Sequence, residues 1–501
     1  MTTVETKQVP MDQGAQESLA DVASAAVESL DSAPQVPSSI LPIPNSMLSS
    51  VSSWWNVSAK QTAEAEFFLY SKSGYFQGAF LGNAKACSSD GPDALAEAYA
   101  LVHDDAAAQP TSISKVNQFM TVGSQLSIDG KVGCIRMVDI GAEKSTSFLN
   151  MFRGQAKRYI NTLEIGTPLK QEEQPKDEEK IVLVHGYGAG SAFFFKNVDA
   201  FAAPRNSRFF ALDWLGMGRS SRPAYRTSHT EARTVERVDA AESFFLTSLE
   251  QWREKMKIEK MTLVGHSLGG YLSLAYALKY PERVSNLILV SPVGIPVPPN
   301  ELRTLKENKH ANPEDLDHAS ISSTSSGNTI SSEDLQRSKP QSMGARTRNI
   351  LGWLWDRNMS PFSVLRNSAI FGPLLMSAYT KRRFSALSPD EKLCLHAYCH
   401  GVFTGRGSSE YCLADILAPG AFARLPMVRR ISSIKVNVSF LYGSHDWMDV
   451  NGGIKAKRVL GAAGNPNVRV FIVKKSGHHL YLDNATEFNK LIKQLLPVAA
   501  P

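Results

Sequence analysis

The sequence predicts an α/β protein with a mostly parallel central sheet, flanking helices and an inserted helical cap. Six short runs rich in β-branched residues suit strands buried on both faces: IVLVH (181–185), RFFALD (208–213), MTLVGH (261–266), NLILVS (286–291), VNVSFLY (436–442) and VRVFIV (468–473). Helical segments over 230–256 and 269–280 separate the earlier runs, and another over 490–496 follows the last. Strands that alternate with helices form a parallel sheet. Two earlier runs, 132–138 and 158–165, predict opening antiparallel strands.

The rhythm of strands and helices divides the chain into five parts. We expect a disordered leader (1–50), a tryptophan-containing helical segment with a variable insertion (51–128), the N-terminal part of the core (129–298), a cap (299–430) and the C-terminal part of the core (431–501). Ser, Ala, Pro and Gln dominate the leader, which favours disorder. The cap begins with a Ser-rich stretch, about 307–349, that we also expect to be disordered.

Composition excludes several classes of protein. The 501 residues are 43% hydrophobic, which permits a sizeable core and argues against a disordered chain or a fibre. The net charge, 54 − 48 = +6, is too dilute over this length to indicate DNA or RNA binding, so we expect no nucleic-acid partner. No uncharged apolar run approaches the ~18 residues of a spanning helix. We expect a soluble or peripheral membrane protein.

The cellular location is predicted from the cysteines and the leader. Five irregularly spaced cysteines suit a reducing compartment, and the first 40 residues lack the basic start and apolar core of a secretory signal. The leader carries six acids through Asp31, whereas a mitochondrial presequence is Arg-rich and poor in acids. We therefore expect an intracellular protein, cytoplasmic or peripheral on membranes or lipid droplets.

Residues 265–269 read Gly-His-Ser-Leu-Gly and match the pattern G-x-S-x-G around Ser267. They follow a β-branched run and open a helical segment. A nucleophilic serine on a sharp strand-to-helix turn needs glycines two residues away on either side to make room. Ser267 is therefore the candidate nucleophile.

A serine nucleophile needs a base and an acid that orients the base, in the chain order Ser, Asp, His in this type of sheet. Asp446 follows the fifth run and His478 follows the sixth, each at a carboxyl edge where open parallel sheets place their sites. Asp449 competes with Asp446, and His479 competes with His478. We favour Asp446, and the preceding Gly477 favours His478.

An oxyanion needs two backbone N–H donors aimed at the developing charge. Leu268, directly after the nucleophile, is one candidate. Tyr187, in the turn His-Gly-Tyr-Gly after the first parallel strand, is the other. The glycine run GYGAG matches neither G-x-G-x-x-G nor a Walker loop, so it does not indicate nucleotide binding.

Long runs of the sequence resemble the α/β-hydrolase superfamily. They are LVHGYGAG, FALDWLGMGRSSRP, SLEQWREKM, LVGHSLGGYLSLAYALKYPERVSNLILVSPVG, LYGSHDWMD and GHHLYLD. The resemblance is strongest to the branch that acts on phospholipid acyl chains, which includes N-acyl-phospholipid lipases, lysophosphatidic acid acyltransferase-like proteins, a triglyceride lipase coactivator and fungal cardiolipin-specific deacylases. It implies the α/β-hydrolase fold, a phospholipid substrate and no cofactor. It also offers a mitochondrial location, on the matrix side of the inner membrane, as the alternative.

His478 and Asp483 form H-x4-D, a spacing that this branch associates with acyl transfer to a lysophospholipid. Acyl-CoA is then a possible second substrate. Two interpretations of Asp483 stay open, because an aspartate at this position also suits a cap of the next helix, whose first turn is 484–487.

Aromatic and basic residues predict contact with a membrane or a lipid headgroup. Trp54 and Trp55 suit a membrane interface, although they can also pack back onto the domain. In the cap, apolar residues alternate with bases and offer both anchors and phosphate contacts: Trp353, Trp355, Leu374, Leu375 and Met376 with Arg366, Lys381, Arg382 and Arg383. A cap packed on itself is the alternative.

Two further motifs lie in the cap. Cys394, Cys399 and Cys412 with the histidines between them lack the paired spacing of a zinc site, so we expect a helix over 390–402 and no metal. Ser385 follows three bases and resembles a phosphorylation site, a pattern that is frequent by chance.

Three functions from different classes remain. The leading hypothesis is a serine hydrolase, a phospholipase or deacylase, that releases a fatty acyl chain from cardiolipin, an N-acyl-phospholipid or a lysophospholipid at a membrane surface. The alternative is an acyl-CoA-dependent lysophosphatidic acid acyltransferase. A non-catalytic lipase coactivator is the third, and the presence of Ser267 argues against it.

Overall fold

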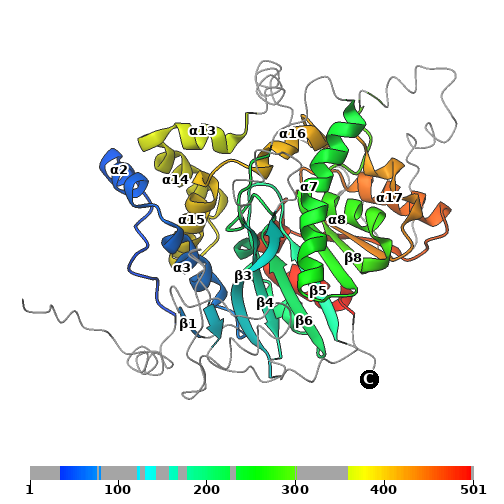
Figure 1. The fold of residues 1–501 in the computed structure, drawn as a ribbon, viewed down its shortest axis with the longest axis horizontal. Helices are drawn as coiled ribbons and strands as arrows, with labels where there is room; N and C mark the ends of the chain where they lie inside the picture. Colours follow the sequence, from blue (N-terminus) through cyan, green and yellow to red (C-terminus); the bar gives the residue numbers. More distant parts are fainter. Residues whose placement is uncertain are drawn as a thin grey trace, which may run out of the picture.

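The structure, a computed structural model, describes residues 34–75, 78–80, 121–123, 130–142, 157–167, 178–225, 233–299, 301 and 359–497. Within these residues the central feature is a ten-stranded sheet in the order β1-β2-β3-β4-β6-β5-β7-β8-β11-β12 (Figure 1). From β6 to β12 all neighbours are parallel, and from β1 to β6 they are antiparallel. The predicted, mostly parallel sheet is therefore confirmed.

The six predicted strands form the parallel half of the sheet. They are β5 (Glu179–Val184), β6 (Ser207–Leu212), β7 (Met261–His266), β8 (Val284–Val290), β11 (Asn437–Gly443) and β12 (Val468–Val473). β7 and β6, which lie on either side of β5, are buried along their whole length, as their continuous apolar sequence predicts. Because these strands run in one direction, their carboxyl ends meet at one edge.

The antiparallel half contains the two predicted opening strands and two more. β3 (Val132–Ala142) and β4 (Lys157–Gly166) match the predictions, while β1 (Gly78–Phe80) and β2 (Thr121–Gly123) extend the edge. These two strands have three residues each, too few for an alternating pattern to reveal them.

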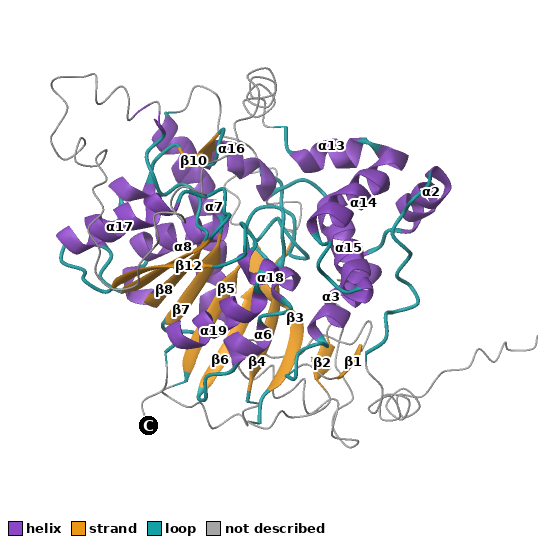
Figure 2. Cartoon of the chain, turned by 180° about the vertical axis from the view of Figure 1, so that it is seen from behind, coloured by secondary structure: helices purple, strands orange, loops and turns teal. Residues whose placement is uncertain are grey.

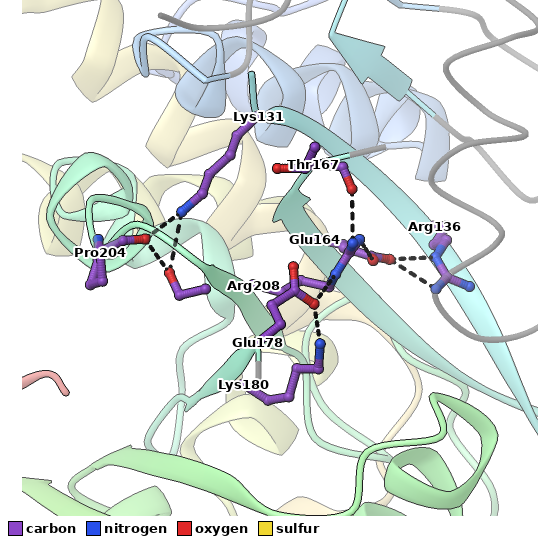
Figure 3. A network of polar contacts seen from close by, with 9 residues as sticks. Lys131, Arg136, Glu164, Thr167, Glu178, Lys180, Pro204 and Arg208 are labelled. Atoms are coloured by element: carbon purple, nitrogen blue, oxygen red, sulfur yellow. Dashed lines mark hydrogen bonds and ion pairs between the residues drawn. The ribbon is translucent and has the colours of Figure 1, made fainter. Parts of the chain in front are cut away.

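A buried charge network joins the two halves near the amino ends of β5 and β6 (Figure 3). Glu164 accepts hydrogen bonds from Arg136 Nη2 at 2.9 Å and from Arg208 Nη1 at 2.8 Å. Arg208 also donates to Glu178, which pairs with Lys180. Removing one partner of a buried pair costs about 3–5 kcal/mol. The network lies at the opposite edge from the strands' carboxyl ends, so it stabilises the sheet rather than the site.

Helices cover both faces of the sheet (Figures 1 and 2). One face carries α7 (Thr234–Lys255), α8 (Leu268–Lys279) and α17 (Val450–Ala462), and the other carries α6 (Val198–Ala202), α18 (Leu480–Asp483) and α19 (Ala485–Leu495). Alternate residues of β5 enter the two cores, Val182 with Trp252 and Ile181 with Phe201. The helices predicted over 230–256, 269–280 and 490–496 correspond to α7, α8 and α19.

The chain between β8 and β11 forms the cap. Its described part contains α13 (Pro361–Asn367), α14 (Gly372–Arg383), α15 (Pro389–Thr404), α16 (Cys412–Ile416) and the short pair β9 (Leu417–Ala418) and β10 (Phe422–Ala423). α15 matches the helix predicted over 390–402. The Ser-rich stretch 307–349 lies outside the described residues.

The N-terminal helices pack against the cap (Figure 2). α3 (Ala59–Tyr70), which lies in the helical segment expected within 51–128, contacts α15, and α2 (Met47–Asn56) contacts α14. Part of the expected leader is packed as well: Ile40 is buried and Ser39 bonds to Glu64 of α3. None of the helices in the described ranges is long and apolar enough to cross a bilayer.

Candidate active site

Ser267 occupies the sharp turn between β7 and α8. Its backbone has φ 54° and ψ −116°, a region that costs a non-glycine residue about 1–3 kcal/mol. Two glycines permit this turn: a Cβ on Gly265 would lie 2.4 Å from the Gly269 carbonyl oxygen, and a Cβ on Gly269 would lie 2.6 Å from that of His185. The expected strand–turn–helix setting of Ser267 is present.

His478 and Asp446 continue from Ser267 as a chain of hydrogen bonds. His478 Nε2 lies 3.0 Å from Ser267 Oγ, and His478 Nδ1 lies 3.1 Å from Asp446 Oδ1. The buried Asp446 carboxylate holds the proton on Nδ1, which leaves Nε2 to accept the serine proton. Asp449, the competing acid, is instead exposed and caps α17 by accepting from Asn451 N at 2.9 Å.

Ser291 is a polar neighbour of this chain that the sequence analysis missed. It directly follows β8, between β7 and β11, and its hydroxyl donates to Asp446 Oδ2. The same Oγ lies 2.7 Å from His478 Nδ1. A polar residue at the end of the strand beside the nucleophile was the available signal. Ser291 thus fixes the carboxylate while Met448 N donates to its other oxygen at 3.0 Å.

His266, inside the G-x-S-x-G pattern, holds the backbone of the catalytic loop. Its Nε2–H donates to the His478 carbonyl oxygen at 3.0 Å, and its Nδ1 has no hydrogen-bond partner among the described residues. Burial and then the neighbouring His478 hold the pKa of His266 well below its usual value. His266 is therefore neutral, with its proton on Nε2.

The turn after β5 runs beside Ser267. A Cβ on Gly186 would lie 2.8 Å from Ser267 Cβ, which shows how closely the two backbones approach. His185 fixes the turn: its Nδ1–H donates to the Gly186 carbonyl oxygen at 2.7 Å, and its Nε2 accepts from Trp214 N at 3.1 Å. Within the described residues, no protein acceptor is found for the backbone N–H groups of Tyr187 and Leu268.

A contact from the cap clamps the loop that carries His478. Arg383, at the end of α14, donates from Nε to His479 Nδ1 at 2.7 Å and from Nη1 to Asp483 Oδ1 at 3.0 Å. The other oxygen of Asp483 accepts from Gly477 N at 2.9 Å. Burial and the Arg383 charge keep the pKa of His479 well below its usual value, so His479 is a neutral acceptor. The residues on both sides of His478 are thereby held.

One expectation for these residues needs correction. Asp483 does not cap the next helix, because Asn484 caps α19 by accepting from Glu487 N at 3.2 Å. Arg383, expected to contact lipid, bonds to His479 and Asp483, and its side chain is 27% exposed. Its contact with lipid stays a prediction.

The other predicted residues are placed as follows. Trp54 and Trp55 lie on α2 and are 40% and 77% exposed, while Arg382 is exposed on α14. Trp353 and Trp355 lie outside the described residues. Ser385 is exposed just after α14. Cys394, Cys399 and Cys412 are buried free thiols, and no metal-binding group of His, Cys, Asp and Glu is found in the described part of the chain.

Residues 180–485 match the family model described as the alpha/beta hydrolase fold. The chain belongs to this family. It is 32% identical over 363 residues to the "1-acylglycerol-3-phosphate O-acyltransferase" of Arabidopsis thaliana, an alignment that covers 71% of this chain and 74% of that protein. It is also 32% identical over 347 residues to the human "(Lyso)-N-acylphosphatidylethanolamine lipase", covering 68% and 85%.

Among solved structures, the chain is similar to the bromoperoxidase from Bacillus anthracis, at 17% identity and a TM-score of 0.44, covering 72% of this chain and 99% of that one. The predicted membership of the α/β-hydrolase superfamily, in a branch whose relatives act on phospholipid acyl groups, is confirmed by the family model and the curated relatives.

Proposed function

We propose that the protein is a serine hydrolase that releases a fatty acyl chain from a glycerophospholipid at a membrane surface. The observation that carries this proposal is the continuous path of hydrogen bonds from Ser267 through His478 to Asp446. Ser267, where the path begins, lies on a strained turn beside two backbone N–H groups. Acyl transfer requires this combination.

The chemistry follows from this geometry. Ser267 Oγ attacks the ester carbonyl while His478 Nε2 takes its proton, and Asp446 stabilises the resulting imidazolium. The N–H groups of Tyr187 and Leu268 bind the oxyanion. The lysophospholipid or glycerol alcohol leaves with the proton from His478, and the acyl chain stays on Ser267. Water, activated by the same histidine, then releases the fatty acid.

The exposed apolar face of α2 is the reason for proposing that the protein acts at a membrane surface. Its apolar residues recur at helical spacing on one face, and the same face points outward: Met47, Leu48, Val51, Trp54 and Trp55. The buried residues of the helix are instead two serines, Ser50 and Ser53. Phe371 and Leu375, next to α2 on the cap, are also exposed. Such a patch, with aromatic residues and the bases of α14 nearby, suits the interface of a bilayer.

The glycerophospholipid class rests on the relatives, whose names specify an acylglycerol phosphate and an N-acylphosphatidylethanolamine. The name of the plant relative also supports an acylglycerol-phosphate acyltransferase as the second candidate function, for which we propose acyl-CoA as the acyl donor. For that activity His478 would take a proton from a lysophospholipid hydroxyl. Asp483, however, is occupied by Arg383 and Gly477, which leaves a substrate-binding role for it without support.

Labelling with a fluorophosphonate tests the proposal. The probe reacts with activated serines, so the wild-type protein should be labelled and Ser267→Ala should not, while Ser273→Ala, a buried serine of α8 that donates to the Gly269 carbonyl oxygen, serves as the control. Absence of labelling in a folded wild-type protein that binds liposomes would favour the non-catalytic coactivator.

A further inference from the structure

Arg222, a partly buried residue in the loop after β6, differs in its partners from seven other arginines. Its hydrogen bonds go only to backbone carbonyls: Nη1 to Arg406 O at 3.0 Å, and Nη2 to Gly218 O at 2.9 Å and Val402 O at 2.7 Å. Seven other arginines each face a carboxylate: Arg136, Arg208, Arg219, Arg237, Arg253, Arg366 and Arg430. A guanidinium has five N–H donors. In the described structure, two of those on Arg222 have no acceptor.

The charge of Arg222 is only partly compensated. Its partners Val402 O and Arg406 O lie in and just beyond the last turn of α15, where a helix terminus carries about −0.5 of an elementary charge. The nearby acids are occupied, since Glu410 pairs with Arg366 at 2.5 Å and Asp213 accepts hydrogen bonds from Ser191 N and Arg219 N. Burial outweighs the attraction of Glu410 and Asp213 and lowers the pKa of Arg222 from its ordinary value. An anion placed beside Arg222 would therefore be stabilised.

Arg222 lines two openings. A pocket of about 160 Å³ lies between α3, α15 and the loop after β6, lined by Thr62, Gly218, Arg219, Arg222, Gly401 and Val402, among others. One water molecule needs about 10–15 Å³ of such space, so a group much larger than water fits. A smaller hollow, also lined by Arg222, is bounded by Gly188, Ala189, Phe362, Phe403 and Glu410, among others.

The smaller hollow brings Arg222 together with the turn beside the nucleophile. Its lining residues Gly188 and Ala189 directly follow Tyr187, and a Cβ on Gly186 in the same turn would lie 2.8 Å from Ser267 Cβ. In a glycerophospholipid, only a few bonds separate the phosphorus atom from the ester carbonyl carbon. Arg222 therefore belongs to the surroundings of the turn that carries a candidate oxyanion donor.

We propose that Arg222 and the pocket between α3 and α15 bind the phosphate group of the substrate's glycerol headgroup. This inference rests on the proposed function, which it deepens by assigning the part of the enzyme that recognises the phosphate. Arg219 lines the same pocket but pairs with Glu66, so Arg222 supplies the uncompensated positive charge.

Two substrates that differ only in the phosphate test the proposal. Acyl release is measured for lysophosphatidic acid and for monoacylglycerol with the same chain, in the same mixed micelles. The ratio of their kcat/KM values should fall about 10- to 100-fold in Arg222→Gln, the usual effect of losing a hydrogen bond to a charged group. Arg222→Lys should keep part of the ratio. Arg237→Gln, which removes an arginine paired with Asp415 outside the pocket, should leave it unchanged.

The ratio of the two kcat/KM values distinguishes a loss of phosphate recognition from a loss of the folded state, because a misfolded variant loses activity on both substrates together. An unchanged ratio in Arg222→Gln would overturn the proposal. If the wild-type protein releases acid from neither substrate, the proposed function fails instead, and binding of sn-glycerol 3-phosphate, measured by calorimetry in wild type and Arg222→Gln, still tests the site.

Competition assays identify the source of the phosphate. We expect sn-glycerol 3-phosphate to inhibit turnover of monoacylglycerol in wild type and much less in Arg222→Gln. Two outcomes would overturn the assignment to a lipid headgroup. One is inhibition by inorganic phosphate but not by sn-glycerol 3-phosphate. The other is inhibition by coenzyme A but not by sn-glycerol 3-phosphate.

Discussion

Replacing Asp483 by asparagine distinguishes a hydrolase from an acyltransferase that uses H-x4-D. In a hydrolase, Asp483 only holds the loop around His478, through Gly477 N and Arg383. Asparagine keeps an amide oxygen for the Gly477 N–H and loses the ion pair. We therefore expect hydrolysis to persist in Asp483→Asn.

The expected loss of kcat in Asp483→Asn follows from the solvent exposure of the ion pair between Arg383 and Asp483. The side chains of Arg383 and Asp483 are 27% and 24% exposed, and such partly solvated pairs contribute about 0.2–1 kcal/mol. Even if all of this is lost from the transition state, kcat falls less than about tenfold. Asp446→Asn is different, because it presents the wrong tautomer of His478 to Ser267 and should cost roughly 10⁴ in kcat.

The assay measures fatty acid release and acyl-CoA-dependent formation of phosphatidic acid for both variants, with Asp449→Asn as an exposed-carboxylate control. Loss of acyl transfer alone in Asp483→Asn would reveal a second activity. A loss of hydrolysis as severe as that of Asp446→Asn would refute the structural role assigned to Asp483.

Three further predictions concern the site, the membrane and stability. Ser291→Ala removes the hydroxyl that donates to Asp446 and should lower kcat about 10- to 100-fold, with KM little changed; activity within twofold of wild type would contradict this role. Replacing Trp54 and Trp55 by Ala should weaken liposome binding, seen by sedimentation, while turnover of a short soluble ester stays intact; a parallel loss of both would place the tryptophans in the structural core. Burial raises the pKa of Glu66 from 4.5 to about 6, so its ionisation should lower the free energy of unfolding by about 2 kcal/mol as pH rises through this window. Denaturant titrations at pH 4.5 and 7 should show this loss in wild type and not in Glu66→Gln. The same change in the free energy of unfolding between the two pH values in both proteins would exclude the effect.

The parallel half of the fold was predictable because burial on both faces leaves a continuous apolar run. All six such runs became strands, whereas β1 and β2 are too short to show a pattern. The position of α2 and α3 against the cap was not predictable. Their contacts with α14 and α15 join segments some 300 positions apart, which no local pattern reports.

The site was predictable where a motif has its own local geometry. Gly265 and Gly269 mark the turn of Ser267, and the ends of β11 and β12 place Asp446 and His478 beside it. For Ser291 the signal is only its place at the end of a predicted strand, and Arg383 has no sequence signal for its bond to His479. Each acts through a contact that exists only after the sheet and the cap have assembled. Arg222 was hidden for the same reason: the absence of an acidic partner becomes visible only in three dimensions.

The central claim is that Ser267 is the nucleophile of an acyl hydrolase. The most direct measurement is fatty acid release from a purified glycerophospholipid in liposomes by wild type and Ser267→Ala, with circular dichroism to show that both are folded. The account predicts a loss of about 10³-fold or more in kcat for Ser267→Ala. Near wild-type release by a folded Ser267→Ala protein would contradict it.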